Sequence, residues 1–308
     1  MKDLHTLPRV EDSFSYIYLE HGRLEQDALS VAFYDADGGK TQIPASALCV
    51  ILLGPGTTVT HAAITACAEN GCLIGWCGEE CVRYYASGWG ETRKSRHLTR
   101  QALLVSHPKA RYLVVNKMYR KRFNTDLSPE LSLEQIRGME GVRIRDAYAQ
   151  ASNETGVPWH GRRYDPKNWS AGDPINKALS AANACLYAVC HAAIISAGYS
   201  PGLGFIHQGT NLSFVYDIAD LYKTDTTIPL SFKVVKESSA DISRRVRTAC
   251  RDYFHQTRML NRIIPDIEEL LGEDEALINE LERDSAEWQV ANLWEPDNPE
   301  GISGGRKW

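Results

Sequence analysis

Short runs of alternating apolar and polar residues fill the start of the chain and predict β-strands. The predicted strands are residues 15–20, 28–35, 48–54, 73–77 and 82–88. The DADGG sequence at 35–39 is a turn signal, and Thr60 is the N-cap of a helical segment at 61–70 that stops at Gly71. The first 88 residues therefore predict a small, mostly β domain with one helix.

Beyond about residue 98, the apolar positions recur with the period of an α-helix. One long helix is predicted at 132–156, with Ser132 as its cap and Gly156 at its end. An alanine-rich helix is predicted at 173–199, where small side chains would let neighbouring helices approach closely. The remaining predicted helical segments are 213–223 and 240–271.

These patterns predict an α+β protein in four parts. The parts are a small N-terminal β-rich domain at 1–88, a linker at 89–97, a larger all-helical catalytic domain at 98–272, and an acidic, disordered tail at 273–308. The length of 308 residues agrees with two domains that each bury a core of their own.

The charge of the chain is unevenly distributed. The total is −5, but residues 265–308 hold 13 acidic and three basic residues, a balance of −10. Taking that −10 from the total of −5 leaves +5 for residues 1–264. A basic body with an acidic end is compatible with a polyanionic partner, which the total charge alone would argue against.

The N-terminal residues carry charges where a secretory signal needs an apolar stretch. No apolar run was expected to approach the ~20 residues that span a bilayer. These two features predict a soluble, cytoplasmic protein.

Eight cysteines are present, and Cys67, Cys72, Cys77 and Cys81 lie close together in the sequence. No two of them have the two-residue spacing of a zinc knuckle. We interpret them as small apolar core side chains in a reducing compartment, and not as a metal or redox site.

Two acidic residues lie in the apolar run FIHQGTNLSFVYDIADLYK at 205–223. Asp217 and Asp220 are three residues apart and share a face of the predicted helix, where two carboxylates repel each other unless a proton or a cation lies between them. Lys223 is a candidate for that cation, and the group would then be a structural salt-bridge patch. The other interpretation is a metal site.

Two further residues favour the metal site. His207 follows the glycine-containing segment GYSPGLGF, and Glu140 lies on the predicted helix 132–156. Carboxylates with one imidazole suit Mg²⁺ or Mn²⁺ better than Zn²⁺. Such a cation among many arginines indicates phosphoester chemistry. The glycine segments lack the lysine and the spacing of a phosphate-binding loop, which disfavours a nucleotide-hydrolysing machine.

Basic residues gather in three zones that suit a long polyanion. The zones are residues 93–122, then Arg162, Arg163 and Lys167, then Arg244, Arg245, Arg247 and Arg251. Tyr164 and Trp169 flank the middle zone and suit stacking on an unpaired base or a duplex end. Each zone alone is equally typical of a solvated helix face, whereas three zones beside an acidic site favour DNA.

Several of these runs resemble one family. GYSPGLGFIHQGTNLSFVYDIAD resembles the signature of the CRISPR-associated spacer integrase, the first of the two universal Cas adaptation proteins. DPINKALSAANACLYAV resembles the preceding helix of that family, and RGMEG with Glu140 resembles its first metal-ligand motif. GRRYDPKNW looks like its subtype I-E, Escherichia-type branch. The similarity spans about residues 14–272.

The resemblance implies a metal-dependent DNA endonuclease and integrase of CRISPR adaptation. Such an enzyme inserts short double-stranded fragments, the spacers, into the CRISPR repeat array by transesterification with a 3′-hydroxyl. The resemblance also implies a homodimer, and a heterohexamer with the small ferredoxin-like Cas adaptation partner.

The resemblance assigns roles to individual residues. The implied catalytic residues are Glu140, His207, Asp220, Asp217 and Tyr187, of which the first three are ligands of Mg²⁺ or Mn²⁺. The DNA-binding residues predicted from the basic zones and the resemblance together are Arg83, Arg162, Arg163, Tyr164, Trp169, Lys223, Arg244 and Arg247. Asp217 is either a further ligand or a partner of Lys223, and His207 is either a ligand or a proton acceptor.

Two rival functions remain on the sequence alone. One is a standalone metallonuclease that cuts branched DNA without joining ends. The other is a DNA-binding scaffold without catalysis, in which the acidic residues are structural.

Overall fold

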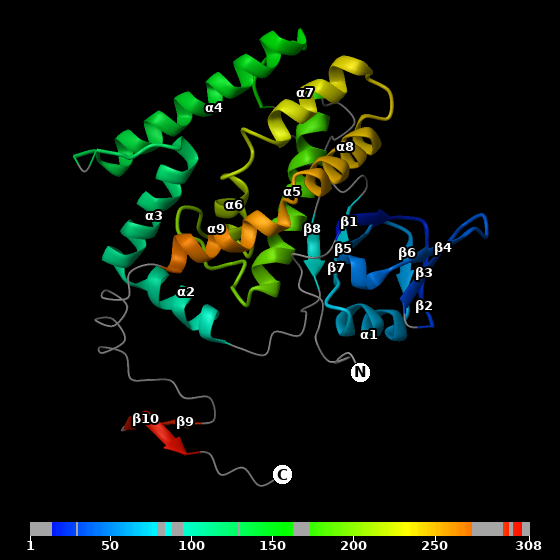
Figure 1. Ribbon diagram of the computed structural model, residues 1–308, viewed down its shortest axis with the longest axis horizontal. Helices are drawn as coiled ribbons and strands as arrows, with labels where there is room; N and C mark the ends of the chain where they lie inside the picture. The colour runs from blue at the N-terminus through cyan, green and yellow to red at the C-terminus, as the bar shows by residue number, and fades with distance from the viewer. Residues whose placement is uncertain are drawn as a thin grey trace.

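A β-rich region and a helical region meet along one sheet (Figure 1). The computed structural model describes residues 14–28, 30–78, 84–87, 95–128, 130–162, 173–272, 292–295 and 298–303. In Figure 1 the strands of the N-terminal region lie on one side of the long helix α5 (Pro174–Ser196), and α2 (Arg96–Ser106) and α3 (Pro108–Phe123) lie on the other side. The predicted fold class, a β-rich N-terminal region before a larger helical region, is confirmed.

Two four-stranded sheets form the β-rich region. The first sheet has the order β1 (Phe14–Leu19), β5 (Leu48–Leu53), β7 (Leu73–Cys77) and β8 (Tyr84–Ser87), and β8 alone is antiparallel to its neighbour. The second sheet has the order β4 (Lys40–Ile43), β3 (Ser30–Asp35), β2 (Gly22–Asp27) and β6 (Thr57–Val59), with β2 and β6 parallel. Helix α1 (His61–Glu69) begins after Thr60, whose side chain accepts the Ala63 backbone N–H at 3.2 Å, as predicted.

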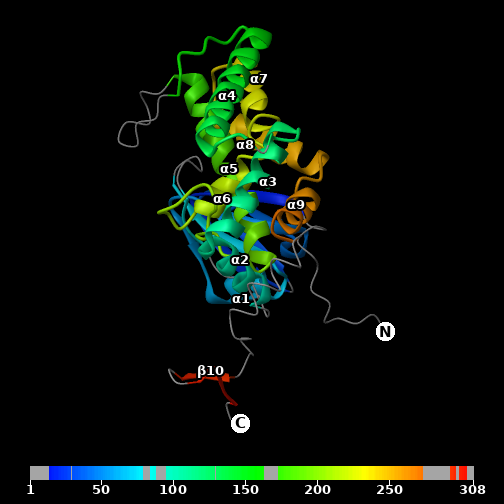
Figure 2. The same cartoon turned by 90° about the vertical axis from the view of Figure 1, so that its left-hand side faces the viewer.

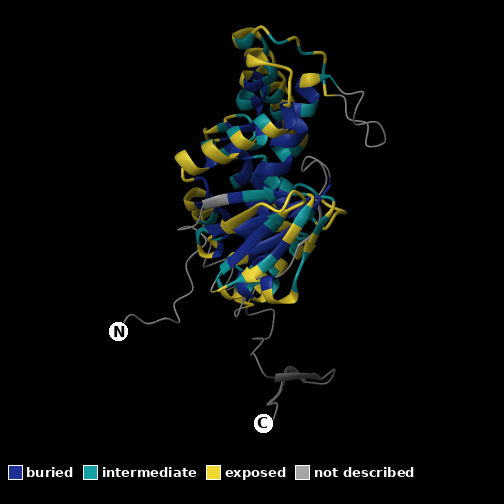
Figure 3. Ribbon diagram, turned by 90° about the vertical axis from the view of Figure 1, so that its right-hand side faces the viewer, coloured by how far each residue is buried: buried dark blue, intermediate teal, exposed yellow. Residues whose placement is uncertain are grey.

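Strand β5 is buried on both faces. Ile51 and Leu53 belong to the core between the two sheets, whereas Val50 and Leu52 belong to the larger core that includes the helices. This explains why the sequence LCVILL is a continuous apolar run, as is typical of a parallel strand covered on both sides. Figure 3 shows the buried residues concentrated in the strands and on the neighbouring helices. Strand β5 therefore borders both hydrophobic cores.

Helix α5 is the centre of the helical region. It packs against α6 (Ser213–Ala219), α7 (Thr227–Glu237), α8 (Ile242–Gln256), α9 (Leu260–Gly272) and β5. By length and composition it could cross a membrane, so the expectation that no apolar run approaches that length was wrong. Because 89% of its most apolar stretch is buried inside the protein, α5 is a core helix of the fold.

The predicted ends of the long helix α4 (Leu133–Thr155) are confirmed. Ser132 and Gln135 form a reciprocal capping box, in which each side chain accepts the backbone N–H of the other residue. Gly156 ends the helix with φ of 75°, a conformation that glycine adopts without strain. Figure 2 shows α4 and α7 at one end of the molecule and α1 at the other.

Other expectations need correction. The helix predicted at 213–223 is α6, which ends at Ala219, so Asp220 and Lys223 lie beyond it. Helix α7 was not among the individually predicted segments, and Pro229 lies in its first turn, where a helix tolerates proline. The predicted helical segment 240–271 consists of two helices, α8 and α9, and Arg258 adopts a φ of 47° between them.

The regions flanking the helical part are described only in part. Strand β8 ends at Ser87 and α2 begins at Arg96, while most of the predicted linker lies outside the described residues. Within the acidic tail the described residues form two antiparallel strands, β9 (Asn292–Glu295) and β10 (Asn298–Ser303). The domain boundaries themselves stay a prediction.

The cysteines in the described part of the chain are buried and form no disulfide there, as predicted for core side chains. Cys67 and Cys72 belong to the core between the two sheets, and Cys77, Cys185 and Cys190 belong to the larger core. Cys81 lies outside the described residues.

Replacing Ile51 by alanine should lower the free energy of unfolding by about 2–5 kcal/mol, because the fully buried side chain leaves a cavity in the shared strand. The measurement is the midpoint of chemical denaturation, with Thr58→Ala on the exposed part of β6 as the control. Equal midpoints for the two variants would contradict the central position of β5.

Candidate functional site: an acid–histidine cluster enclosed by basic side chains

Four segments that are distant in the sequence bring the candidate site together. Glu140 comes from α4, His207 from the loop after α5, Asp217 from α6, and Asp220 from the residue that follows α6. A fifth residue, Arg122 on α3, reaches the backbone carbonyl of Asp217 at 3.3 Å. The structure thus assembles the predicted acids and the histidine around an arginine that the sequence reasoning had placed in a DNA-facing basic zone.

Asp217 holds the histidine loop in place. The Phe205 and Ile206 backbone N–H groups donate to its Oδ2 at 2.6 and 3.1 Å, and the His207 N–H donates to its Oδ1 at 2.9 Å. The Nδ1 of His207 lies 2.8 Å from the same Oδ1. With its side chain fully buried and both oxygens engaged, Asp217 positions His207 and does not pair with Lys223.

The bond to Asp217 also fixes the form of the imidazole. A carboxylate accepts only, so Nδ1 of His207 carries a proton and donates it to Asp217, which leaves Nε2 as the ring nitrogen that can contact another group. This Nε2 lies 3.8 Å from Oδ2 of Asp220. The same arrangement, a carboxylate behind a histidine, is the usual support of a histidine that ligates a metal.

The loop around His207 is tightly packed. A Cβ at Gly204 would lie 2.4 Å from the His207 carbonyl oxygen and 2.7 Å from the Ser213 Cβ, so glycine is needed for this close approach. The Arg111 guanidinium donates to the Phe205 carbonyl at 3.0 Å through Nε and at 2.6 Å through Nη2. These contacts explain why the glycine-containing segment GYSPGLGF precedes the histidine.

Asp220 faces both His207 and two basic groups. Its Oδ1 lies 2.6 Å from the Lys223 ammonium, and its Oδ2 lies 3.4 Å from Nη2 of Arg122. Burial alone would raise the pKa of Asp220, but Lys223 and Arg122 outweigh burial and hold the pKa below its ordinary value. Burial likewise acts to lower the pKa of Lys223, and the attraction of Asp220 outweighs it and raises that pKa. Asp220 is thus a carboxylate and Lys223 an ammonium at neutral pH.

Glu140 is held by two arginines. Arg143, one turn further along α4, donates to both of its oxygens at 2.9 and 3.1 Å, and Nη1 of Arg122 lies 3.6 Å away. The side chain of Arg122 is 3% exposed, and its Nε is buried without a hydrogen-bond partner. Its guanidinium is therefore a buried cation between the carboxylates of Glu140 and Asp220.

Tyr187 on α5 completes the site. The Lys223 ammonium lies 4.8 Å from the centre of its ring, and Tyr216 packs edge-on against it at 5.0 Å. Tyr216 also contacts the ring of His207, at 5.8 Å. The predicted catalytic residues Tyr187, His207 and Asp220 therefore lie in one connected group.

The predicted DNA-binding residues have different surroundings. Lys223 is paired with Asp220, and Arg162 donates to Asn176 and Ser180 at the start of α5. Arg247 lies over the ring of Tyr18 at 4.5 Å, whereas Arg244 is exposed. The others, Arg83, Arg163, Tyr164 and Trp169, lie outside the described residues. DNA contact by any of these residues stays a prediction.

The chemistry of the site fits a hard divalent cation. Two carboxylates and one imidazole nitrogen are the donor types that Mg²⁺ and Mn²⁺ accept. Arg122 already provides a positive charge between the two carboxylates. Within the described part of the chain, however, no three His, Cys, Asp or Glu side chains stand close enough together to hold a metal as they are. Glu140 is the outlying donor, since Arg143 holds its carboxylate.

Sequence reasoning missed the roles of Arg111, Arg122 and Arg143. Arg111 and Arg122 lie in the basic zone 93–122, which indicated a phosphate-binding surface, whereas Arg143 lies outside all three zones. Arg143 does follow Glu140 at the i,i+3 spacing of a helical ion pair, and this signal was readable in the sequence. No comparable signal marks Arg122, whose partners come from other elements.

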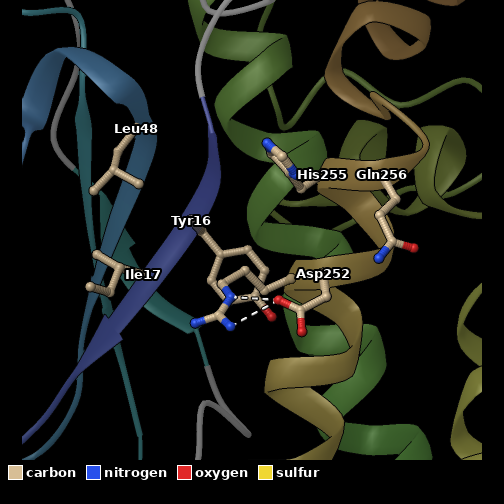
Figure 4. A pocket seen from close by; sticks show the side chains of 7 residues that line it. Tyr16, Ile17, Leu48, Asp252, His255 and Gln256 are labelled. Atoms are coloured by element: carbon tan, nitrogen blue, oxygen red, sulfur yellow. Dashed lines mark hydrogen bonds and ion pairs between the residues drawn. The ribbon is translucent and has the colours of Figure 1, made fainter.

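A cavity of about 370 Å³ lies elsewhere, between β1 and the end of α8. Tyr16, Ile17 and Leu48 line it from the sheet, and Asp252, His255 and Gln256 line it from the helix (Figure 4). An ion pair of 2.8 Å joins Asp252 to Arg251 there. The cavity contains none of the residues of the acid–histidine site.

Comparisons with known proteins agree with this geometry. A family profile described as CRISPR associated protein Cas1 matches residues 119–244, which include Arg122, Glu140, His207 and Asp220. A Thermus thermophilus relative, CRISPR-associated endonuclease Cas1 2, is 50% identical over 266 residues, covering 86% of this chain and 82% of its own length. The Escherichia coli relative, CRISPR-associated endonuclease Cas1, is 43% identical over 272 residues, covering 88% and 89%.

Solved structures share the same architecture. The crystal structure titled TtCas1-DNA complex has a TM-score of 0.80 and 45% identity, covering 95% of this chain and all of that chain. The fold and the site together place the chain among the CRISPR-associated proteins. Within that class, it belongs to the Cas1 family.

Replacing Asp217 by asparagine should lower the free energy of unfolding by roughly 1–3 kcal/mol, because backbone donors at 205–207 lose an acceptor in a buried position. The measurement is chemical denaturation, and the control is Asp225→Asn at a nearby exposed carboxylate. Equal stability of the two variants would show that Asp217 does not support the loop.

Proposed function

We propose that this chain is a divalent-metal-dependent DNA endonuclease and strand-transfer integrase of CRISPR adaptation. The observation that carries the proposal is the cluster in which the Nε2 of His207 faces Asp220 and Arg122 joins that pair to Glu140. Family membership supports it, since several relatives are named CRISPR-associated endonucleases.

The proposed cation is Mg²⁺ or Mn²⁺, held by Glu140, Asp220 and Nε2 of His207. When bound, such a cation lowers the pKa of an attacking hydroxyl and stabilises the charge that develops on a phosphate. Asp217 keeps the imidazole oriented with its Nδ1 proton pointing away from the cation. Lys223 and Tyr187 border the same site and suit the positioning of a phosphate or a strand end.

The proposed reaction is a transesterification. The 3′-hydroxyl oxygen of a DNA fragment attacks a phosphodiester of the CRISPR repeat, a new P–O bond forms, and the P–O bond to the leaving 3′-oxygen breaks. The attacking hydroxyl loses a proton and the leaving oxygen gains one, so the step needs no energy source. This balance agrees with the lack of a phosphate-binding loop in the sequence.

The proposed substrate is double-stranded DNA, both as fragment and as repeat. The basic body of the chain supports this, and so does the similarity to a structure titled as a complex of Cas1 with DNA. We propose exposed Arg244 on α8 as one phosphate contact. A casposase structure bound to an integration product also matches, with a TM-score of 0.64, but at 13% identity its likeness concerns the fold alone.

The proposed assembly is a cytoplasmic homodimer that joins the small ferredoxin-like Cas adaptation partner in a heterohexamer. We also propose the subtype I-E branch, on the resemblance of the sequence GRRYDPKNW. Co-purification with that small partner, followed by mass measurement of the complex, tests the assembly.

One observation favours the scaffold as a second candidate. Glu140, Asp217 and Asp220 are all engaged in hydrogen bonds or ion pairs, as they would be in a purely structural patch. In that case the acids contribute stability and have no part in catalysis.

Strand transfer by Asp220→Ala and His207→Ala proteins separates these candidates. With Mg²⁺ or Mn²⁺ and the small partner, each variant should lose roughly 100-fold or more of the joining rate, because each removes a group at the reacting centre. Asp146→Ala, an exposed acid on the same helix as Glu140, is the control for loss of charge.

Two outcomes oppose the proposal. Full joining activity in both variants contradicts the proposed metal site. If neither the wild type nor the variants join or cut DNA, the non-catalytic DNA-binding scaffold is the better interpretation. If the wild type cuts branched DNA but never joins ends, even with the small partner, the chain is a standalone metallonuclease.

DNA binding should weaken steeply with salt, because each neutralised phosphate releases counterions. Replacing Arg244 by alanine should lower the slope of log affinity against log salt by about 1. Arg245→Ala is the matched control, since that side chain is already bonded to Glu237 and to the Ser238 carbonyl. Fluorescence anisotropy of a labelled duplex measures both, and a flat salt response contradicts the proposed phosphate contacts.

A further inference from the structure

The charges of the acid–histidine site balance without a metal. The site holds three carboxylates and three basic side chains: Arg122, Arg143 and Lys223 pair with Glu140 and Asp220, while the Asp217 carboxylate accepts backbone N–H groups and the Nδ1–H of His207. Arg143 and Lys223 each make contacts within hydrogen-bond distance, at 2.9 and 2.6 Å. His207 donates its Nδ1–H to Asp217 and adds no negative charge to the site. The described site therefore carries no excess negative charge.

This balance disfavours a divalent cation bound on its own. A cation entering such a site must either displace basic groups from the carboxylates or bring the site to a net charge of +2. Like charges within a few ångström repel strongly where water is scarce, and separating a partly buried ion pair has its own cost. Glu140 shows the obstacle directly, because Arg143 binds both of its oxygens.

A DNA phosphate removes both obstacles at once. It brings the negative charge that the site lacks, and it offers the basic groups another partner. The planar guanidinium of Arg143 fits two phosphate oxygens as well as it fits a carboxylate. Arg143 and Lys223 are accessible for this exchange, with side chains 22% and 21% exposed, whereas Arg122 is sealed at 3%.

We propose that this site loads its divalent cation together with DNA, because phosphates draw Arg143 and Lys223 away from the carboxylates that the cation needs. The inference rests on the proposed metal site and adds that the affinity of this site for the cation depends on bound DNA. Arg122 stays in place as the fixed positive charge that keeps the carboxylates together before loading. Coupling of two ligands is reciprocal, so the cation strengthens DNA binding by the same factor.

The test titrates Mn²⁺ into the full-length protein and measures free Mn²⁺ by electron paramagnetic resonance. The titration is made with and without a short duplex that lacks 3′-hydroxyls, so that no strand transfer occurs. We expect Mn²⁺ to bind roughly 10- to 100-fold more tightly with the duplex. Anisotropy of the same duplex, with and without Mn²⁺, should give the same factor.

A charge variant identifies the cause of the coupling. Arg143→Gln frees the Glu140 carboxylate, so Mn²⁺ should bind roughly tenfold more tightly than in wild type without DNA, and the effect of DNA should shrink. Arg145→Gln removes the same charge from an exposed position two residues along α4, and it should behave as wild type in the DNA-free titration.

The outcomes separate this inference from the proposed function. Equal Mn²⁺ affinity with and without DNA overturns the inference and leaves the metal site standing. Unchanged DNA-free affinity in Arg143→Gln overturns the assigned cause. If Asp220→Asn binds Mn²⁺ as the wild type does under both conditions, the metal is held elsewhere and the proposed site itself fails. The wild-type titrations decide the coupling even if Arg143→Gln does not fold.

Discussion

The buried carboxylate of Asp217 is the interaction on which the rest of the site depends. It accepts three consecutive backbone N–H groups and the Nδ1 of His207, so a single side chain fixes both the path of the loop and the tautomer of the ring. A buried acid with this many charge-assisted donors has its desolvation offset locally. Asp220, only three residues later, does not bind the loop backbone and instead faces Lys223 and Arg122. The two acids of this short segment thus have separate tasks, because Asp217 is fully buried against the loop and Asp220 is partly exposed beside Lys223 and Arg122.

Much of the fold follows from local rules that are readable in the sequence. The capping box at Ser132, the glycine after α4 and the apolar run of β5 each specify an element from its own residues. Strand β2 was missed because its sequence GRLEQD has one buried residue, Leu24, and gains its order by pairing with β3 and β6. The break between α8 and α9 was missed because Arg258 adopts a conformation that non-glycine residues seldom show.

The site was predictable in its residues and less so in its electrostatics. Acids in an apolar run and a histidine behind glycines indicate a special site, and the structure does bring Asp217, Asp220 and His207 together. The burial of Arg122 was not readable, since a basic residue in a basic run looks solvated until three other elements enclose it. Its guanidinium contributes a positive charge between Glu140 and Asp220. The Cas1 relationship identified the motif residues, and the geometry adds how their charges balance.

The double burial of β5 has a consequence for how this chain can change over time. Side chains alternate along a strand, so inserting or deleting one residue just before Val50 would exchange the faces of the strand residues that follow. Ile51 and Leu53 would then point toward the helices, and Val50 and Leu52 toward the second sheet. Both cores would be mispacked by one event, while single substitutions disturb only one. A change in the length of β5 is therefore more disruptive than a substitution, and this strand fixes how the β-rich and helical regions pack against each other.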